Sequence, residues 1–392
     1  MGPLEGLKVI EVAAMGPVPF CGMLLADLGA DVIRIDRTTQ AEMGIDKPAR
    51  FELRGRNKRS VAIDLKSSAG KRVFLTLAAQ ADVVLEGFRP GVSERLGIGP
   101  DQCLAARPAL VYGKATGWGQ EGPLAMTAGH DINYIALTGA LHMIGSAGGA
   151  PVPPLNLVGD YGGGALFLAF GVMAAVFEAG RSGRGQVVDA AMIDGVSSLL
   201  TVFHGFQAAG QLNPDRGTNV LDGGAPYYTT YQTADGRHVA VGAIESRFYR
   251  VLIEKLGLDR ATLPDRDNPE MWPRLRAVLA RRFLDKTRTE WEKVFDGCDA
   301  CVSPILDLTE AAEHPHNRFR NVTQPLGGVR HPSPAPRFSR TPGALVRPPA
   351  EAGDHTAEVL ADWGLSDDEI AACFDIGALS GQQRKSAAQS GP

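Results

Sequence analysis

Short apolar runs alternate with amphipathic segments through the first 114 residues of the chain. Strand-like runs occupy residues 7–13, 30–36, 60–65, 82–88 and 110–114, and helical patterns fall between them at 20–28, 69–79 and near 100–106. A strand, a helix and a second strand in that order form a unit whose two strands run parallel. Repetition of this unit predicts an α/β fold built on a doubly wound parallel sheet.

The pattern changes after about residue 215. Polar, aromatic-rich strand patterns at 227–233 and 238–241 flank Ala234-Asp-Gly-Arg237, which is typical of a hairpin turn. A chain of 392 residues also exceeds the size at which one hydrophobic core usually keeps growing. We therefore expect a large Rossmann-like domain over 1–200, a linker over 201–224 and a smaller α+β domain over 225–325. A return linker over 326–350 would lead to C-terminal helices over 351–392 that rejoin the large domain and end in a frayed tail. The second of these helices would open with the capping box Ser366-Asp-Asp-Glu369.

Charge and cysteine content narrow the class of protein. The 40 basic and 44 acidic residues give a formal net charge of -4, without a long basic run, so we expect no nucleic-acid partner. Five cysteines spread through a large chain fit a reducing compartment better than a disulfide scaffold. Cys298 and Cys301 form a lone C-x-x-C without a second ligand pair, which favours two structural thiols over a zinc or redox site. We expect no metal.

Targeting and membrane signals are weak. The N-terminus has no apolar signal region and the C-terminus has no peroxisomal or retention tripeptide. The most apolar stretch, residues 165–177, is shorter than the roughly 20 residues that span a bilayer. A cytoplasmic protein without a membrane partner is therefore expected.

The turn after the first strand, residues 14–20, suggests a dinucleotide site, since Asp36 follows at the spacing of a ribose-binding acid. The motif fails in detail. Two of its three glycines are missing, and Pro17 and Pro19 remove N–H groups that would face a pyrophosphate. We do not expect a nucleotide cofactor of that kind.

Basic residues follow several of the predicted strands. Arg37 follows the second strand, four cations lie within residues 54–59, and Lys66 and Arg89 follow later strands. Ligands of open parallel sheets bind outside the carboxyl ends of the strands, where these cations could form a phosphate-binding rim. A solvated basic loop is the alternative for residues 54–59.

The segment 129–164 carries two groups suited to proton transfer. His130 lies near a predicted helix start, and Asp160 lies between Gly159 and Tyr161-Gly-Gly-Gly. An imidazole and a carboxylate can take a proton from one face of a carbon acid and return it to the other. Taken singly, each is more often structural: His130 as a surface group, and Asp160 as the N-cap of the next helix.

Two further acids have two interpretations each. Asp131 could cap a helix or orient a substrate, and capping is the commoner case. Glu245 ends a strand before a helix, where it could cap that helix or orient a histidine.

The chain resembles the family III CoA-transferases and, within them, the α-methylacyl-CoA racemases. The resemblance extends from Gly6 to about Ser339, and its motifs occur in order, which makes it highly specific. They are Gly6-Leu-Lys-Val-Ile-Glu, Leu28-Gly-Ala-Asp-Val-Ile-Arg-Ile-Asp-Arg37, Asp64-Leu-Lys66, Gly87-Phe-Arg-Pro-Gly91, Gly117-Trp-Gly-Gln120, Gly129-His-Asp-Ile-Asn-Tyr134, Pro154-Leu-Asn-Leu157, Gly183-Arg-Gly-Gln-Val-Val-Asp189, Leu221-Asp-Gly-Gly-Ala-Pro226 and Val241-Gly-Ala-Ile-Glu245.

The resemblance implies an acyl-CoA substrate and an interlocked homodimer, with the large domain binding CoA. It makes His130 and Asp160 the catalytic acid/base pair and Glu245 the acid that supports the histidine, reaching it from the other subunit. The substrate and CoA contacts expected on this basis, together with the arginines at the next strand end, are Arg37, Ile63, Asp64, Leu65, Lys66, Arg89, Arg95, Gly129, Asp131, Ile132, Asn133 and Tyr134.

The expected activity is that of an isomerase. It would interconvert the (2R) and (2S) forms of 2-methylacyl-CoA thioesters by 1,1-proton transfer through an enolate, in branched-chain lipid metabolism, with no cofactor other than the CoA of the substrate. Transferases of the family share the aspartate that Asp160 matches and use it as a nucleophile. A CoA-transferase is therefore the alternative, and a non-catalytic acyl-CoA binder is a weaker one. His130 is the residue that discriminates, because the racemases place a histidine there.

Overall fold

The computed structural model describes residues 2–39, 45 and 47–383. The chain divides into two compact units. Unit 1 comprises Met1–Thr138, Leu155–Leu199 and Arg320–Pro392, and unit 2 comprises Gly139–Pro154 and Leu200–Phe319. This division differs from the predicted boundaries, because residues 139–154 and 201–224 both belong to the compact fold of unit 2.

Unit 1 is built on a seven-stranded sheet in the order β12-β3-β2-β1-β4-β5-β6. Its strands are β1 (Lys8–Val12), β2 (Asp31–Asp36), β3 (Arg59–Ile63), β4 (Val83–Glu86), β5 (Val111–Thr116), β6 (Val187–Ala191) and β12 (Leu379–Ser380). Strands β1 to β6 run parallel, and β12 pairs antiparallel with β3. The predicted doubly wound α/β fold is confirmed, with one short antiparallel edge strand added.

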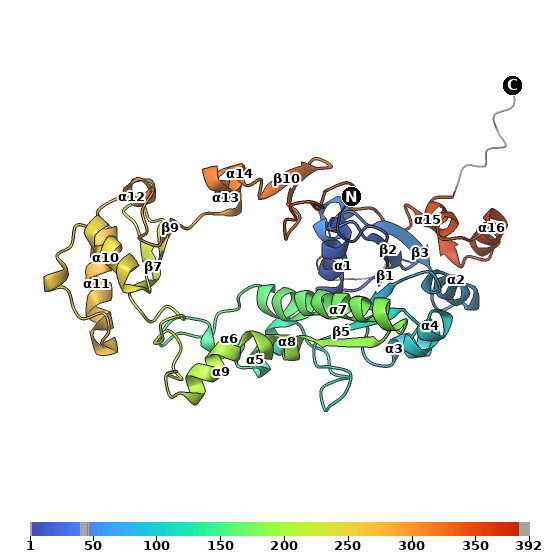
Figure 1. Ribbon diagram of the computed structural model, residues 1–392, viewed down its shortest axis with the longest axis horizontal. Coiled ribbons are helices and arrows are strands. Elements are labelled where there is room, and N and C mark those ends of the chain that lie inside the picture. Colours follow the sequence, from blue (N-terminus) through green and yellow to red (C-terminus); the bar gives the residue numbers. More distant parts are fainter. Residues whose placement is uncertain (1, 40–44, 46, 384–392) are drawn as a thin grey trace, which may run out of the picture. The chain divides into compact units, whose positions relative to one another are not determined.

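Helices cover both faces of this sheet (Figure 1). The described helical segments of unit 1 are α1 (Pro17–Asp27), η1 (Ala49–Phe51), η2 (Leu53–Gly55), α2 (Ser68–Ala78), α3 (Val92–Leu96), α4 (Pro100–Ala106), α5 (Asp131–Leu137), η3 (Leu157–Ala165), α7 (Leu166–Ser182), α8 (Met192–Leu199), α15 (Thr356–Asp362) and α16 (Asp367–Asp375). Helices α1 and α7 share one core cluster with the sheet, and α2, α4, α15 and α16 share another. Neighbouring residues of β1 point to opposite cores, so that Val9 joins the first cluster and Ile10 the second.

The longest helical run continues from η3 into α7. Residues Leu157–Ser182 form 26 helical residues that are long and apolar enough to cross a membrane by length and composition alone, whereas the sequence suggested a shorter stretch. In this fold the run lies against the sheet, since Leu168, Val172 and Ala175 are buried in the core of unit 1. One side of the run is thus a core helix of the domain, whereas Phe170 and Phe177 on the same run are exposed.

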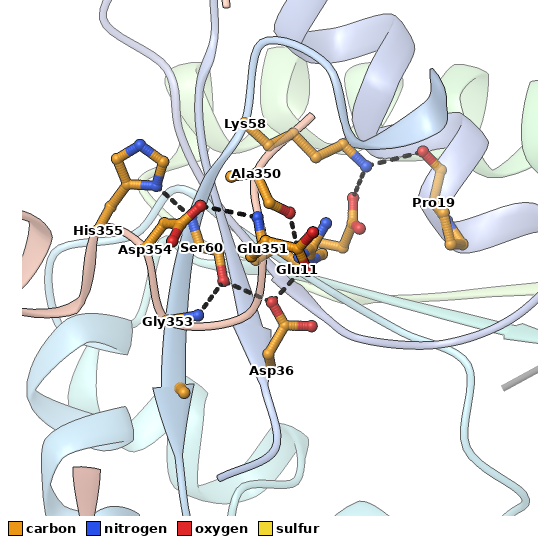
Figure 2. A network of polar contacts seen from close by, with 12 residues as sticks. Glu11, Pro19, Asp36, Lys58, Ser60, Ala350, Glu351, Gly353, Asp354 and His355 are labelled. Atoms are coloured by element: carbon orange, nitrogen blue, oxygen red, sulfur yellow. Dashed lines mark hydrogen bonds and ion pairs between the residues drawn. The ribbon is translucent and has the colours of Figure 1, made fainter. Parts of the chain in front are cut away.

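The C-terminal segment is hydrogen-bonded to the sheet at β3 (Figure 2). The Ser60 hydroxyl accepts from the backbone N–H of Gly353 at 2.7 Å, and the Thr356 hydroxyl accepts from the N–H of Ala62 at 3.1 Å. A hairpin of β10 (Thr323–Leu326) and β11 (Val329–Pro332) precedes this segment, across the predicted boundary between the small domain and the return linker. Ser366 caps α16 in the predicted capping box.

A buried ion pair lies between the sheet and α1 (Figure 2). The Lys58 Nζ lies 2.5 Å from Glu11 Oε2 and donates to the Pro19 carbonyl at 2.8 Å, in the first turn of α1. Burial raises the pKa of Glu11 and lowers that of Lys58. A Cβ on Gly22 would lie 1.8 Å from Glu11 Oε2, so this turn of α1 needs a glycine for the pair to fit.

Unit 2 packs helices around an antiparallel sheet in the order β7-β8-β9. Its elements are α6 (Ala140–Met143), α9 (Thr201–Ala208), β7 (Tyr228–Gln232), β8 (His238–Gly242), α10 (Ser246–Lys255), η4 (Arg260–Thr262), η5 (Pro269–Met271), α11 (Trp272–Phe283), α12 (Arg288–Phe295), β9 (Val302–Pro304), α13 (Leu308–Glu313) and α14 (Pro315–Phe319). The turn between β7 and β8 closes with the N–H of Thr233 donating to the Arg237 carbonyl at 2.8 Å, as the hairpin prediction requires. Aromatic rings fill the core: Phe283 meets Trp291 edge-on, and Trp291 stacks on Phe295.

Candidate active site

The strand order places a crevice beside β1. Chain connections leave β1 toward β2 on one side, and β4 lies on its other side, so the winding of the sheet reverses between β1 and β4. The loops that follow these two strands lie close together, since a Cβ on Gly87 would be 3.1 Å from the Cβ of Ala14. In open α/β sheets this point, at the carboxyl ends of the strands, is where ligands bind.

Asp160 lies at this crevice. A Cβ on Gly16, which follows β1 at φ 70°, would be only 3.2 Å from Asp160 Oδ1, so the glycine lets the carboxylate approach the start of α1. The Asn156 side-chain amide donates to Asp160 Oδ2 at 3.0 Å. Tyr161 stacks on Phe20 of α1 with ring centroids 4.4 Å apart, which holds the segment in place.

The backbone around Asp160 is a π-helical turn, η3. Such turns are rare in proteins, and those that occur are often found at functional sites. The capping interpretation of Asp160 is wrong, because the N-cap of α7 is Ala165 and Asp160 lies inside η3. The glycines that follow allow close packing. A Cβ on Gly163 would lie 2.6 Å from the Val196 side chain of α8, and a Cβ on Gly164 would lie 2.9 Å from the Pro17 side chain of α1.

His130 is the exposed N-cap residue of α5. Its backbone N–H donates to Asn133 Oδ1 at 3.0 Å. The Tyr134 hydroxyl donates to the Gly129 carbonyl, and the Tyr134 ring meets Trp118 edge-on with centroids 4.7 Å apart. The first turn of α5 therefore fixes the backbone that carries the imidazole.

Asp131 connects His130 to Asp160. Its Oδ1 accepts a hydrogen bond from the backbone N–H of Asp160 at 2.6 Å. The Asp131 side chain is buried, and a Cβ on Gly159 would lie 2.4 Å from the same oxygen, so Gly159 makes room for the contact. Burial raises the pKa of Asp131, as does the nearby Asp160 carboxylate, while the Asp160 N–H lowers it. Asp131 occupies the first position of α5 without capping it, since the N-cap is His130.

The cations of residues 54–59 do not belong to the predicted phosphate-binding rim. Within residues 54–59, every cation forms an ion pair with an acid of unit 1, so neither a phosphate rim nor a solvated basic loop describes this run. The pairs are Arg54 with Glu52, Arg56 with Asp27, Lys58 with Glu11 and Arg59 with Asp31. Sequence reasoning could not foresee the pairs of Arg56, Lys58 and Arg59, because their acids come from distant strands and helices, whereas Glu52 lies two residues from Arg54.

Exposed cations do follow the parallel strands at the carboxyl edge. Arg37 follows β2, Lys66 follows β3 and Arg89 follows β4, all exposed, and Arg95 is exposed on α3. Burial raises the pKa of Tyr134, Asp160 raises it further, and the Arg89 guanidinium lowers it. Arg89 is therefore close enough to the α5 segment to influence it.

The remaining predicted contacts have mixed environments. Ile63 is buried at the end of β3, whereas Leu65 is half-buried. The Asp64 side chain accepts from the Lys66 N–H at 3.0 Å, which shapes the turn into α2. Ile132 and Asn133 are exposed on α5.

Glu245 belongs to unit 2. It is exposed at the N-cap position of α10, and its side chain makes no capping hydrogen bond there. Burial raises the pKa of the Cys301 thiol, and the Glu245 carboxylate raises it further, which places that carboxylate near the thiol. The capping interpretation therefore has no support from the geometry.

Two residues at the site were not among those singled out from the sequence. Asn156 holds Asp160 Oδ2, and Gly16 faces Asp160 Oδ1. An asparagine four residues before the aspartate, one helical turn away, was the available signal for the first. Nothing local to Gly16 indicates the second, because the contact depends on how the chain returns to the sheet.

Comparison with known proteins assigns the family. Residues 4–356 match the family described as CoA-transferase family III. The chain is 46% identical over 370 residues to the alpha-methylacyl-CoA racemase of Mus musculus, covering 94% of this chain and 95% of that protein. It is 43% identical over 373 residues to the enzyme of that name from Homo sapiens, with the same coverage. The crystal structure of a CAIB/BAIF family protein from Brucella suis superposes with a TM-score of 0.80 at 25% identity, covering 92% of this chain and 99% of that one. The chain belongs to CoA-transferase family III.

Proposed function

We propose that this protein is a racemase that interconverts the (2R) and (2S) forms of 2-methylacyl-CoA thioesters. The observation that carries the proposal is the hydrogen bond from the Asp160 N–H to Asp131 Oδ1, because it ties the residue after His130 to the backbone of Asp160. An imidazole and a carboxylate are thereby held on neighbouring backbone segments at the crevice of the sheet. The similarity to two racemases over nearly the whole chain supports the same assignment.

In the proposed mechanism the two groups act on opposite faces of the α-carbon. In the S to R direction His130 removes the α-proton, and Asp160 in its acid form returns a proton to the other face; the reverse direction exchanges their roles. Backbone N–H groups at the start of α5 would hold the enolate oxygen, since such donors are preorganised and partly positive. Positioned acid/base groups typically supply on the order of 10² to 10⁴ in rate, so enolate stabilisation must supply much of the remainder.

The substrate contacts follow from the same placement. We propose that Arg37, Lys66, Arg89 and Arg95 bind the phosphates of CoA along the carboxyl edge, because guanidinium and ammonium groups pair well with phosphate. The segment Gly129–Tyr134 would hold the thioester. CoA enters as part of the substrate, and the proposed proton transfer requires no further cofactor.

Glu245 would support His130 from the second subunit of an interlocked homodimer. Exposed apolar side chains on α7 are consistent with such a partner, with Leu166 51%, Phe170 75% and Phe177 71% exposed. The described cysteines are all free, which supports a reducing, cytoplasmic compartment.

The test is deuterium exchange at the α-carbon. A 2-methylacyl-CoA incubated with the enzyme in D2O, without any acyl acceptor, is expected to gain α-deuterium, measured by mass spectrometry. His130→Ala is expected to lose at least about 10²-fold in the exchange rate of the (2S) substrate, and Asp160→Ala in that of the (2R) substrate, the lower range for a general acid/base.

Other outcomes would identify other functions. A CoA-transferase would move the acyl group between carriers and form an adduct at Asp160 that hydroxylamine traps. A binding protein would show neither exchange nor transfer. Exchange of the (2S) substrate that continues unchanged in His130→Ala would contradict the two-base assignment.

A further inference from the structure

Glu86 is a buried acid beside the crevice that the proposed mechanism does not use. It is the last residue of β4, and its side chain is 1% exposed. The next residues, Gly87 to Gly91, form the loop that carries Arg89. A fully buried carboxylate at the carboxyl end of a central strand is costly unless it is hydrogen-bonded.

The Glu86 carboxylate joins the two ends of this loop. Its Oε2 accepts from the backbone N–H of Phe88 at 2.5 Å. Its Oε1 lies 3.3 Å from the hydroxyl of Ser93 in the first turn of α3, and Ser93 shares that hydroxyl with Glu94 Oε2 at 3.1 Å. Gly91, between them, has φ 78° and forms the N-cap of α3. The loop is therefore folded around one carboxylate.

Charged neighbours from two elements face this carboxylate. Lys114, the register partner of Glu86 on β5, places its Nζ 3.8 Å from Oε1 and 2.7 Å from Glu94 Oε1 on α3. The buried Tyr112 of β5 also lies within electrostatic reach. Burial raises the pKa of Glu86 to about 7, while the Phe88 N–H and Lys114 act in the opposite direction. This buried network is a cost that a loop without a role in binding would not require.

We propose that Glu86 is a positioning residue that holds the Gly87–Gly91 loop so that Arg89 faces a phosphate of the CoA substrate. The inference rests on the proposed function, since it assumes that the crevice binds an acyl-CoA. Among the described residues, the hydrogen bonds and the ion pair of the Glu86 carboxylate go to the loop, α3 and β5, so Glu86 would act through Arg89 and not on the reacting carbon.

The experiment measures CoA affinity and exchange kinetics in the full-length protein. Glu86→Ala is expected to raise the Kd for CoA, measured by calorimetry, and the KM for 2-methylacyl-CoA by about tenfold, because a hydrogen bond to a charged group is lost. The kcat for exchange should change by less than about threefold, because the contact with CoA stabilises the bound substrate and the transition state equally. Glu86→Gln keeps an oxygen that can accept from the Phe88 N–H, so it should restore most of the affinity.

Three further variants keep the test sharp. Ser93→Ala removes the second anchor and should weaken CoA binding in the same direction, which also covers the case that Glu86→Ala fails to fold. Asp101→Asn is the control, because it neutralises an exposed carboxylate on α4, which is outside this network, and it should leave Kd unchanged. In an Arg89→Ala background, Glu86→Ala should raise the Kd for CoA by less than about a further twofold, since the effects of interacting residues are not additive.

The inference is overturned if Glu86→Ala and Ser93→Ala leave the Kd for CoA unchanged, if kcat falls without a change in KM, or if the full effect of Glu86→Ala persists without Arg89. A wild-type protein that does not bind CoA at all would instead overturn the proposed function, and with it the assumption beneath the inference, before any variant is compared.

Discussion

At the residue scale, Asp131 gains a role different from the one expected. The sequence suggested a substrate contact or a helix cap, whereas the buried carboxylate accepts the backbone N–H of Asp160 at 2.6 Å. Loss of that acceptor would leave a buried N–H without its partner, which costs about 1–3 kcal/mol. Without this hydrogen bond, the backbone of Asp160 would be held less firmly in its position relative to His130.

Asp131→Ala is therefore expected to reduce α-proton exchange by about tenfold or more, which corresponds to roughly 1.4 kcal/mol in the barrier. Asp131→Asn retains an oxygen acceptor and should stay within a few-fold of wild type. The measurements are the exchange rate in D2O and the Kd for CoA. A large rise in Kd with normal exchange at saturating substrate would instead support the expectation that Asp131 contacts CoA.

At the scale of elements, α1 depends on the charged pair beneath it. Lys58 joins Glu11 of β1 to the Pro19 carbonyl in the first turn of α1, and α1 begins beside Asp160 at Gly16. The position of Gly22 is constrained by the same pair, because an added Cβ would overlap Glu11 Oε2. The start of α1 is thus held to the sheet by Lys58, and at the crevice Gly16 leaves room for the Asp160 carboxylate.

Gly22→Ala is expected to lower the free energy of unfolding by about 2 kcal/mol or more, since disrupting a buried ion pair typically costs about 3–5 kcal/mol and alanine returns about 1 kcal/mol of helix propensity. Gly180→Ala in α7 is the matched control, because a Cβ there meets nothing within 4 Å. That control should be neutral or more stable. Urea unfolding of the two variants checks the prediction, and equal stabilities would contradict it.

At the scale of the whole molecule, the apolar face of α7 is the feature that a single chain leaves unexplained. Phe170 and Phe177 are 75% and 71% exposed on a helix whose opposite side is buried against the sheet. Exposed apolar surface on one side of a helix commonly marks an association surface. It fits the homodimer proposed above.

Phe170→Glu combined with Phe177→Glu is expected to shift the protein from dimer toward monomer, because each charge would have to be desolvated on association. Light scattering after size exclusion gives the mass, and Glu178→Gln on the same helix serves as the control. A wild-type protein that runs as a monomer would contradict the proposed dimer, and a double variant that remains fully dimeric would place the interface elsewhere.

Part of the fold and of the site could be predicted from local pattern. The alternation of apolar strands and helices predicts a parallel sheet, because each period is encoded within a few residues. The hairpin at residues 233–237 and the capping box at Ser366 were predicted for the same reason. The ion pairs of Arg56, Lys58 and Arg59 were not, since their acids lie in other elements.

By itself, the sequence determined the class of fold and, through its motifs, the family, and it led to the proposal that His130 and Asp160 are the acid/base pair. Only the tertiary structure decided what surrounds them: Asp131 beneath the Asp160 backbone, Gly16 at its carboxylate and Glu86 inside the loop of Arg89. The physical reason is the distance along the sequence over which each kind of information acts. Periodicity and motifs are local properties of the chain, whereas burial and hydrogen bonding between residues far apart in sequence exist only once the sheet has brought the strand ends together.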